Sequence, residues 1–521
     1  MKTGGGILAA AALAMASAYA DDVSVSAMAT SETEVATLSG VSSRAVLNAY
    51  EGPTFEVAVW RGEMAYAPVL ERFAAEILSC DGVEENRMGL ELFSLGGVDF
   101  RTQACGTLLA RRLDVVVPCR VSGGMPAFCK VSVRADAKPG RYRFGPLVVR
   151  VIDRELPPPG EWRYFLDLWQ HPWAVARYFN LVPFSKEHYA AMEPVYRTLA
   201  ECGVKSLTVT LLDLPWNHQC YDAYHSMIGR TRRTDGTWVF DYTVFDEYVK
   251  FGRRCGLGPD IACYTMCPWG YTVRWRDESG ATVRAEAKPG TAAFEDYWGG
   301  FLEDFALHLK EKGWFDDAYV AMDERSPEDV RQIAEFVRRK APGMKIAMAG
   351  NKKPSEFSGI RIDNYSQYLG HVTDEFLAEI PERRATGCRT TFYVCCDPTR
   401  PNTFMESDNG EAFWVGAYPA FSGLDGFLRW AANSWPRDPY ADASFGNWRA
   451  GDTFLVYPKG EMSARLLALR AGIVAAEKIR ILGDEAHLSG LRDFYDYGKA
   501  MSGAVDFDVC RKQTENEVNN D

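Results

Sequence analysis

The chain has 521 residues, 47% of them hydrophobic, and a formal net charge of −12 at neutral pH. A chain of this length buries a large core and is too long for one compact layer, so we expect two domains or a barrel with an accessory module. The acidic balance, without a basic block, argues against nucleic acid or an anionic membrane as the main partner. We therefore expect no nucleic-acid partner.

Residues 1–20 have the features of a secretory signal peptide. Lys2 precedes an apolar run rich in Ala, Leu and Met, and Ala18-Tyr19-Ala20 forms a small-residue cleavage site before two aspartates. We expect cleavage after Ala20 and a secreted or periplasmic protein. No later stretch is long and apolar enough to cross a bilayer, so we expect no membrane span.

Residues 21–156 show short apolar–polar alternations separated by turn signals, without a convincing helical period. This pattern is typical of a β-sandwich, which we expect as an accessory domain. Residues 157–160, Pro-Pro-Pro-Gly, then form a stiff linker, because three prolines in a row join neither a helix nor a sheet. The predicted strands of the sandwich are Thr54–Trp60, Leu90–Leu95, Leu113–Val121, Ala127–Val133 and Leu147–Ile152.

Residues 161–450 repeat a rhythm of strand, loop and helix. The clearest helix is Phe294–Lys312, in which aromatic and leucine side chains line one face and Gly313 follows as a stop signal. Eight strands alternating with helices predict an α/β fold, a (β/α)8 TIM-like barrel. The predicted strands are Tyr164–Trp169, Leu207–Leu212, Ile261–Met266, Ala318–Asp323, Lys345–Ala349, Arg361–Tyr365, Thr391–Cys395 and Gly426–Trp430.

Residues 451–521 follow the barrel. We expect one more strand at Thr453–Pro458 and a helix at Ser463–Leu482 that packs on the outside of the barrel. The polar tail, Lys512–Asp521, is expected to fray.

Two adjacent carboxylates, Asp323 and Glu324, close the fourth predicted barrel strand. Ser326-Pro327 directly afterwards has the residues of a helix start, a serine cap followed by proline at the first helical position. A barrel enzyme presents catalytic groups at this C-terminal end of its strands. The long connections Asp213–Tyr242 and Cys267–Ala293 are expected at the same mouth, where long loops are usually functional.

The adjacency of these two acids indicates a particular chemistry. Ordinary glycosidases take their two carboxylates from separate segments, so that they flank the scissile bond about 5 Å or more apart. Neighbouring acids suit a substrate that supplies its own nucleophile, as a 2-acetamido sugar does with its carbonyl oxygen. Successive residues of a regular strand point to opposite faces, so the strand must break or bulge at Asp323 for both acids to reach one sugar.

Aromatic and amide side chains gather at the other predicted strand ends. Rings stack on sugar faces and amides bind hydroxyl groups, so their shared position favours a sugar pocket. Core packing is the competing interpretation for each ring by itself. The candidate substrate-binding residues are Trp169, Trp216, Asn217, Trp269, Asn364, Tyr365, Tyr393 and Trp430.

Metal and cofactor chemistry have no support in the sequence. His218 and His225 lack the spacing of a metal site. No serine-hydrolase elbow, phosphate-binding loop or dinucleotide fingerprint occurs at a strand–helix turn. We expect neither a metal nor a cofactor.

Six segments together resemble glycoside hydrolase family 123, the β-N-acetylgalactosaminidase family, whose members often carry a domain of unknown function over the C-terminal part of the barrel. The resemblance extends from about Trp162 to Leu482. The segments are Tyr164–Arg177, Asp241–Val249, Met322–Glu324, Pro401–Phe404, Gly426–Trp435 and Gly451–Pro458.

The resemblance implies a β-sandwich, a (β/α)8 barrel and retaining, substrate-assisted hydrolysis through an oxazolinium intermediate. In this scheme Asp323 polarises the acetamido group and Glu324 is the general acid/base. Tyr365 or Tyr393 resembles the tyrosine expected near the acetamido oxygen. Little of the region Asp21–Glu155 shares the resemblance, so the sandwich there depends on the strand pattern alone.

The sequence therefore predicts a glycoside hydrolase that removes terminal β-linked N-acetylgalactosamine from a glycan or glycoconjugate. Three alternatives stay open at this point. The chain could prefer another N-acetylated hexosamine, or bind carbohydrate on the same scaffold without catalysis. It could also be an ordinary two-carboxylate glycosidase with its nucleophile elsewhere, which predicts activity on sugars that lack the acetamido group.

Overall fold

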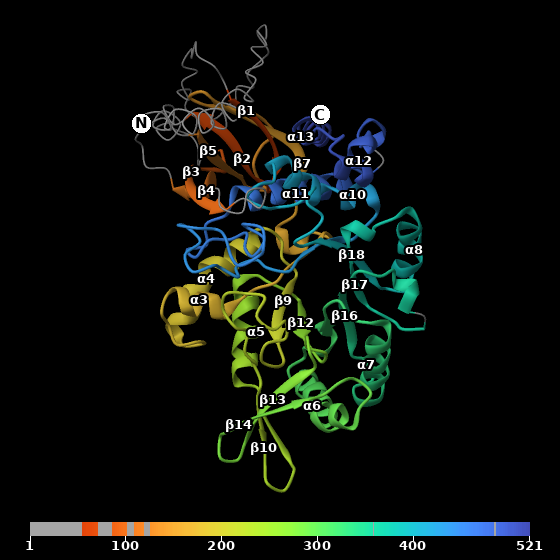
Figure 1. The fold of residues 1–521 in the computed structure, drawn as a ribbon. Helices are drawn as coiled ribbons and strands as arrows, with labels where there is room; N and C mark the ends of the chain where they lie inside the picture. The colour runs from red at the N-terminus through yellow and green to blue at the C-terminus, as the bar shows by residue number, and fades with distance from the viewer. Residues whose placement is uncertain are drawn as a thin grey trace, which may run out of the picture.

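The computed structural model describes residues 55–70, 86–101, 109–118, 126–357, 359–483 and 486–520. It contains an N-terminal pair of sheets, an eight-stranded barrel and a C-terminal group of helices (Figure 1). The predicted signal peptide, residues 1–20, lies outside the described residues. Among the described residues, no helix is long and apolar enough to cross a membrane.

The two N-terminal sheets face each other over a shared core. A three-stranded sheet has the order β1-β7-β6, and a four-stranded sheet has the order β2-β5-β3-β4. Val59 of β1 and Val149 of β7 belong to one buried cluster with Ala67 of β2 and Val131 of β5. The strands are β1 (Phe55–Arg61), β2 (Met64–Leu70), β3 (Met88–Arg101), β4 (Leu109–Pro118), β5 (Pro126–Val133), β6 (Gly140–Phe144) and β7 (Leu147–Glu155).

Two of these strands were not predicted from the sequence. β2 reads MAYAPVL, which is apolar almost throughout and shows no alternation. β6 is only five residues long and carries two arginines. Both strands exist because a partner strand satisfies their backbone hydrogen bonds, which a local pattern does not reveal.

Eight parallel strands form the barrel in sequence order. The sheet runs from β8 at one edge to β9 at the other. A bridge between Leu166 and Val204, with the Lys205 N–H donating to the Leu166 carbonyl at 2.9 Å, brings these edges together. The (β/α)8 fold class is therefore confirmed. The strands are β8 (Phe165–Leu168), β9 (Ser206–Thr210), β12 (Asp260–Tyr264), β15 (Ala318–Met322), β16 (Lys345–Gly350), β17 (Asn364–Tyr368), β18 (Arg389–Val394) and β19 (Gly426–Arg429).

The predicted strands agree with these bounds to within two residues, except for the sixth. We predicted Arg361–Tyr365, whereas β17 begins only at Asn364. Arg361 and Asp363 instead form a short-range ion pair at 2.6 Å before the strand. Asn364 and Tyr365 therefore open β17 and do not lie at its C-terminal end.

Helices surround the barrel, and α7 begins at the serine cap that the sequence predicted. Ser326 accepts a hydrogen bond from the Asp329 N–H at 3.1 Å and starts the helix that follows the acid pair. The predicted helix Phe294–Lys312 is observed over Ala292–Glu311, with Thr291 as its cap. The helices are α3 (Pro172–Tyr178), α4 (Lys186–Glu201), α5 (Thr243–Cys255), α6 (Ala292–Glu311), α7 (Pro327–Lys340), α8 (Asp374–Ala385), α9 (Asn409–Ala417) and α10 (Pro419–Ser422).

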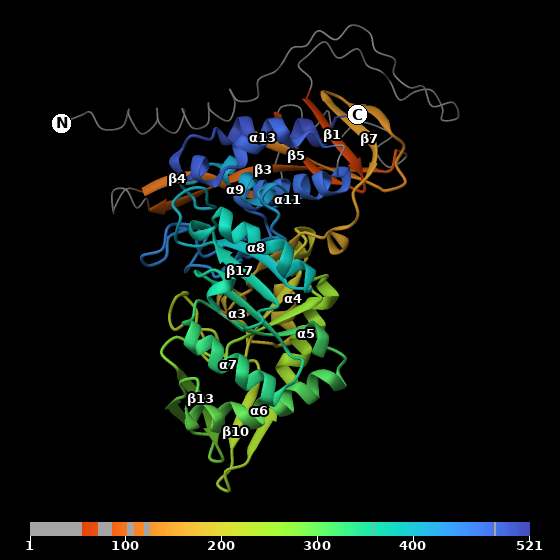
Figure 2. The same cartoon turned by 90° about the vertical axis from the view of Figure 1, so that its right-hand side faces the viewer.

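The two long connections after the second and third barrel strands hold a small sheet that was not predicted. Its four strands are ordered β11-β10-β13-β14 and project away from the barrel on the side opposite the sandwich (Figures 1 and 2). Each strand is short, and β10, β13 and β14 carry charged residues at alternate positions, which in the sequence resembles a polar loop. The strands are β10 (Gly229–Arg232), β11 (Trp238–Asp241), β13 (Thr272–Asp277) and β14 (Thr282–Glu286).

The C-terminal region differs from its prediction in two places. Residues 453–458 form no strand, and only single bridges join Phe454 to Asn433 and Val456 to Met462. The tail does not fray, because α13 (Phe507–Val518) docks on the sandwich, where the Val518 carbonyl accepts the Trp60 indole N–H at 3.1 Å. A polar tail looks exposed in sequence, but within Lys512–Asn520 the side chains of Thr514 and Val518 are buried, and Val518 gives this segment an apolar contact. The short helix α12 (Tyr497–Ser502) precedes it.

Helix α11 (Ala464–Leu482) connects the sandwich to the barrel. It was predicted as Ser463–Leu482 and begins one residue later, with Ser463 as its cap; the sandwich covers its side away from the barrel (Figure 2). Arg465 pairs with Asp114 of β4 at 3.0 Å, and Lys478 pairs with Glu63 at 2.8 Å. All four side chains are buried, so the sandwich is tied to the barrel by ion pairs inside the interface.

Candidate active site at the mouth of the barrel

The acid pair lies directly beyond the end of a barrel strand. Met322 is still in register with Met348 of β16, and β15 ends there. Asp323 is the first residue outside the strand, and α7 begins four residues later at Pro327. The strand therefore breaks at Asp323, as two acids that reach one sugar require. Its alternation no longer forces Asp323 and Glu324 to opposite faces.

Asp323 is held by the loop that follows β12. Its Oδ2 atom accepts a hydrogen bond from the Trp269 indole N–H at 3.2 Å. The Arg325 guanidinium lies 4.9 Å from the centre of the Trp269 ring and donates to the Cys267 carbonyl at 2.8 Å. A second nitrogen of Arg325 donates to the Glu324 carbonyl at 2.8 Å. Arg325 thus joins the two loops that carry Asp323 and its partner.

Glu324 is held by residues at the ends of β16 and β18, on the side of β15 away from β12. Its Oε1 atom accepts a hydrogen bond from the Tyr393 hydroxyl, and its Oε2 atom accepts one from the Asn351 amide at 3.1 Å. Tyr393 lies at the end of β18, and Asn351 follows the last residue of β16. The two carboxylates are therefore oriented by separate sets of donors, which allows them separate tasks.

Burial and charge shift the titration of this group of residues. Burial raises the pKa of Asp323, and the neighbouring Glu324 charge adds to the shift, while the Glu324 N–H, Arg325 and the Trp269 N–H oppose it. Burial raises the pKa of Tyr393 strongly, and the charges of Glu324 and Asp323 raise it further. The Tyr393 hydroxyl therefore stays protonated and serves as a donor to Glu324.

Three aromatic rings pack beside the acid pair. Trp169 lies 5.0 Å from Trp216 and 4.4 Å from Tyr264 between ring centres, and Trp216 lies 5.1 Å from Tyr264. The Asp323 charge contributes to the raised pKa of Tyr264, which places this cluster close to the acids. The Trp216 indole nitrogen is buried and has no hydrogen-bond partner among the described residues.

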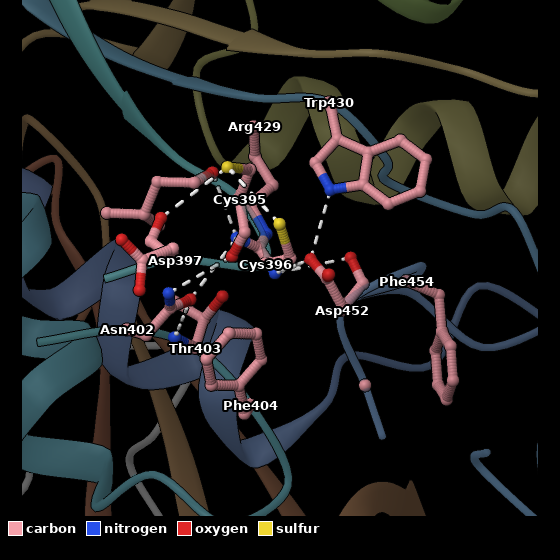
Figure 3. A network of polar contacts seen from close by, with 12 residues as sticks. Cys395, Cys396, Asp397, Asn402, Thr403, Phe404, Arg429, Trp430, Asp452 and Phe454 are labelled. Atoms are coloured by element: carbon pink, nitrogen blue, oxygen red, sulfur yellow. Dashed lines mark hydrogen bonds and ion pairs between the residues drawn. The ribbon is translucent and has the colours of Figure 1, made fainter. Parts of the chain in front are cut away.

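Trp430 is anchored by a buried polar network (Figure 3). Its indole N–H donates to Asp452 at 3.0 Å, and Asp452 pairs with Arg429 at 2.7 Å. Arg429 also donates to the side chain of Asn402 at 3.2 Å and to the Val394 carbonyl at 3.0 Å. Asn402 lies in the segment Pro401–Phe404 and Asp452 in the segment Gly451–Pro458, so these two segments support the ends of β18 and β19.

The remaining predicted residues lie in other environments. Asn217 is exposed at a turn with φ of 53°. Asn364 lines a small cavity inside the barrel with Asp167 and Ser366. The Tyr365 hydroxyl donates to the Lys352 carbonyl, and its ring contacts Phe357 and Arg383 of the outer layer. Of the two tyrosines that the sequence left open, Tyr393 is the one that hydrogen-bonds an acid of the pair.

Sequence reasoning did not select Asn351 and Arg325, although both contact the acid pair. Arg325 is the last residue of the motif AYVAMDER, and Asn351 lies two residues after the predicted strand Lys345–Ala349, so a search of residues near strand ends could have found them. Tyr368 was also not selected. Its ring lies 5.8 Å from that of Tyr393, and its hydroxyl donates to Asp397.

Comparison with known proteins identifies the family. The sequence profile described as "Glycoside hydrolase 123, catalytic domain" matches residues 169–482, which is more than half of the chain. The chain belongs to glycoside hydrolase family 123. This family 123 chain is therefore a glycoside hydrolase that acts on glycans, and no curated protein matches it.

One solved structure agrees with this fold over most of its length, and two others align only weakly. A family 123 glycoside hydrolase from Clostridium perfringens, studied for the details of glycolipid glycan hydrolysis, aligns with a TM-score of 0.77 and 22% sequence identity over 90% of this chain and 93% of that chain. A family 39 glycoside hydrolase from Bacteroides cellulosilyticus WH2 aligns with a TM-score of 0.37 and 11% identity, covering 81% and 83% of the two chains. The family 10 xylanase Xyn10B modules from Clostridium thermocellum align with a TM-score of 0.34 and 7% identity, covering 80% and 86%.

Proposed function

We propose that this family 123 chain releases terminal β-linked N-acetylgalactosamine with retention of configuration, by substrate-assisted catalysis. The observation that carries the proposal is the pair of adjacent carboxylates with separate anchors, Asp323 on Trp269 and Glu324 on Tyr393 and Asn351. Adjacent acids at one strand end leave the opposite side of the sugar without a protein nucleophile, and the acetamido group fills that role. The choice of the galacto sugar comes from the resemblance to the family.

In the first step the acetamido carbonyl oxygen bonds to the anomeric carbon as the glycosidic bond breaks. Glu324 gives its proton to the leaving oxygen, and the Asp323 carboxylate accepts a hydrogen bond from the acetamido N–H, which stabilises the positive charge of the oxazolinium ion. In the second step water adds to the anomeric carbon, Glu324 takes its proton, and the acetamido oxygen leaves. Both inversions occur at one carbon, so the configuration is retained.

The aromatic residues near the acid pair suit the recognition of a sugar. Trp269 is 36% exposed with one face on Arg325, which leaves ring surface for stacking. Trp430 is partly exposed and provides a further ring, whereas Trp169 and Trp216 are 2% and 4% exposed and pack in the core beside the acids.

A panel of para-nitrophenyl glycosides tests the proposal. We expect hydrolysis of the β-N-acetylgalactosaminide, slower hydrolysis of the β-N-acetylglucosaminide and none of the plain β-galactoside. Activity on the plain galactoside would contradict the substrate-assisted route, because that sugar has no acetamido nucleophile.

A galacto-configured thiazoline separates catalysis from simple carbohydrate binding. This compound mimics the bicyclic oxazolinium ion, so we expect it to raise the unfolding temperature of the wild-type protein in a thermal-shift assay. The matched control is Asp323→Asn, which keeps the shape of the side chain and loses the charge that stabilises the ion. No stabilisation of the wild type at saturating thiazoline would count against this mechanism.

We also infer export of the chain from the Met1–Ala20 segment. Expression with this segment should give a mature protein that begins at Asp21 in the extracytoplasmic fraction. N-terminal sequencing of that fraction measures it, and an intact Met1 in all fractions would refute it.

A further inference from the structure

The small projecting sheet has two faces that differ in how their arginines are neutralised. On the face toward α6, the Arg230 guanidinium lies 4.4 Å from the Trp298 ring and 3.7 Å from the Phe301 ring. Arg232 of the same face pairs with Asp296 of α6 at 2.8 Å. Every arginine that points toward the helix therefore has a ring or an acid beside it.

The opposite face carries three arginines that have neither an aromatic ring contact nor an ion pair among the described residues. Arg274 and Arg284 stand directly opposite each other on β13 and β14, and Arg276 is two residues further along β13 on the same face. Arg274 donates to the Asp213 carbonyl at 3.5 Å and Arg276 to the Gly280 carbonyl at 2.9 Å. None of the three forms an ion pair with any residue in the described ranges. We call this group the arginine face.

This arrangement is unfavourable in the protein alone. Like charges directly opposite each other on an antiparallel ladder repel, and Arg274 faces Arg284 in that way. Glu286 on the same face stands opposite Thr272 and forms no ion pair with the three arginines. The Asp213 carboxylate lies beyond the sheet, close enough to Arg274 for the arginine charge to help lower its pKa. In a chain of net charge −12, a face with three arginines, of which Arg276 and Arg284 form no ion pair with any described residue, indicates a surface that an anion completes.

The arginine face is connected to the candidate active site through the chain itself. Trp269, which holds Asp323, precedes Arg274 by five residues, so their Cα atoms are at most about 17 Å apart. The contact of Arg274 with Asp213, just beyond the second barrel strand, keeps β13 on the mouth side of the barrel. This separation is within the length of a short oligosaccharide, so the arginine face is close enough to the mouth to contact a sugar beyond the terminal one.

We propose that the arginine face binds an anionic group, a carboxylate or a sulfate ester, on the aglycone side of the glycan. This inference rests on the proposed function, because it assigns the substrate class of the same site. Arginine suits this task because its planar guanidinium binds carboxylate and sulfate oxygens in a bidentate manner. The enzyme is then selective for acidic glycoconjugates whose terminal sugar is a neutral N-acetylhexosamine.

The test compares two oligosaccharides that differ in one group. Both carry terminal β-N-acetylgalactosamine, followed by glucuronate in one and by glucose in the other. A second pair compares a 6-sulfated with an unsulfated penultimate galactose and thus separates the two anion chemistries. For at least one pair, we expect kcat/KM of the wild type to be about tenfold higher on the acidic substrate at low salt, with the preference falling as salt increases.

The triple variant Arg274→Gln, Arg276→Gln, Arg284→Gln should bring that ratio close to one. The ratio is informative even if the variant loses activity in general, because both substrates present the same reacting sugar. A matched control removes three exposed arginines elsewhere, Arg143, Arg254 and Arg492, and should keep the wild-type ratio. A wild-type ratio near one for both pairs, or an unchanged ratio in the triple variant, would overturn the inference.

Failure of the proposed function gives a different result. If no substrate of the panel is cleaved, the hydrolase assignment to this sugar fails, and binding then decides the inference. Fluorescence anisotropy with the labelled glucuronate and sulfated oligosaccharides should show weaker binding by the triple variant than by the control variant. Equal binding by both variants would refute an anion site on this face.

Discussion

A carboxyl group inside the barrel offers the sharpest test of the electrostatics. Asp167 of β8 is 3% exposed and lines the interior cavity with Tyr264 and Ser366. Burial raises the pKa of Asp167 from 3.8 to about 7, and the charge of Asp260 adds to this shift. The nearest cation, Arg389, is committed to Asp260 at 2.6 Å. Asp167 is therefore protonated in the folded protein at mildly acidic pH.

The sign of the effect on stability follows from proton binding. Between pH 3.8 and about 7 the folded state keeps the Asp167 proton and the unfolded state releases it, so stability falls as pH rises through this window. At 1.36 kcal/mol per pH unit, the full shift corresponds to about 4 kcal/mol of stability that is lost by pH 8. The variant Asp167→Asn keeps the size of the side chain and removes the titration.

We expect Asp167→Asn to unfold at a higher temperature than the wild type. The gap between the two unfolding temperatures should be several degrees at pH 8, for about 4 kcal/mol, and much smaller at pH 5. Differential scanning fluorimetry at both pH values measures this gap. The control Glu335→Gln removes an exposed carboxyl on α7 and should show the same gap at both pH values. An Asp167→Asn gap that does not change between pH 5 and pH 8 would refute the argument.

Further variants test the site and the interface. Glu324→Gln should lower kcat by about 10²–10⁴-fold on natural glycosides and much less on nitrophenyl glycosides, which leave without a proton. Equal losses would mean that Glu324 is not the acid. Trp269→Phe removes the N–H that lowers the pKa of Asp323, so the acidic limb of the pH–rate profile should move to higher pH, and an unmoved limb would exclude Asp323 as an ionised participant. Arg465→Leu leaves Asp114 buried without its cation and should destabilise the protein by about 3–5 kcal/mol, with partial recovery when Asp114→Asn is added. Thermal unfolding of the single and double variants measures the loss of stability and its recovery. If Asp114→Asn restores nothing, the loss does not come from the unpaired charge of Asp114.

Local signals in the sequence were sufficient for the barrel. Seven of its strands are short apolar runs between turn residues, and helix caps such as Ser326 mark where the next element starts. The sixth strand was misplaced because Arg361–Tyr365 and Asn364–Tyr368 alternate equally well. The pairing of Ala347 with Asn364 chooses between them, and pairing is a property of the assembled sheet.

The sequence by itself determined the barrel, the end of β15 at the acid pair and the helix that follows, because each depends on residues within one turn or one strand. Only the tertiary structure decided which groups hold the acids. Asn351 and Tyr393 lie 27 and 69 residues from Glu324, and Tyr365 looked equally suitable until the packing placed its hydroxyl on the Lys352 carbonyl. The projecting sheet likewise exists only because two distant hairpins pair through β10 and β13, which turns scattered arginines into one charged face. Contacts between residues far apart in the chain depend on the closure of the whole barrel, and no local pattern encodes them.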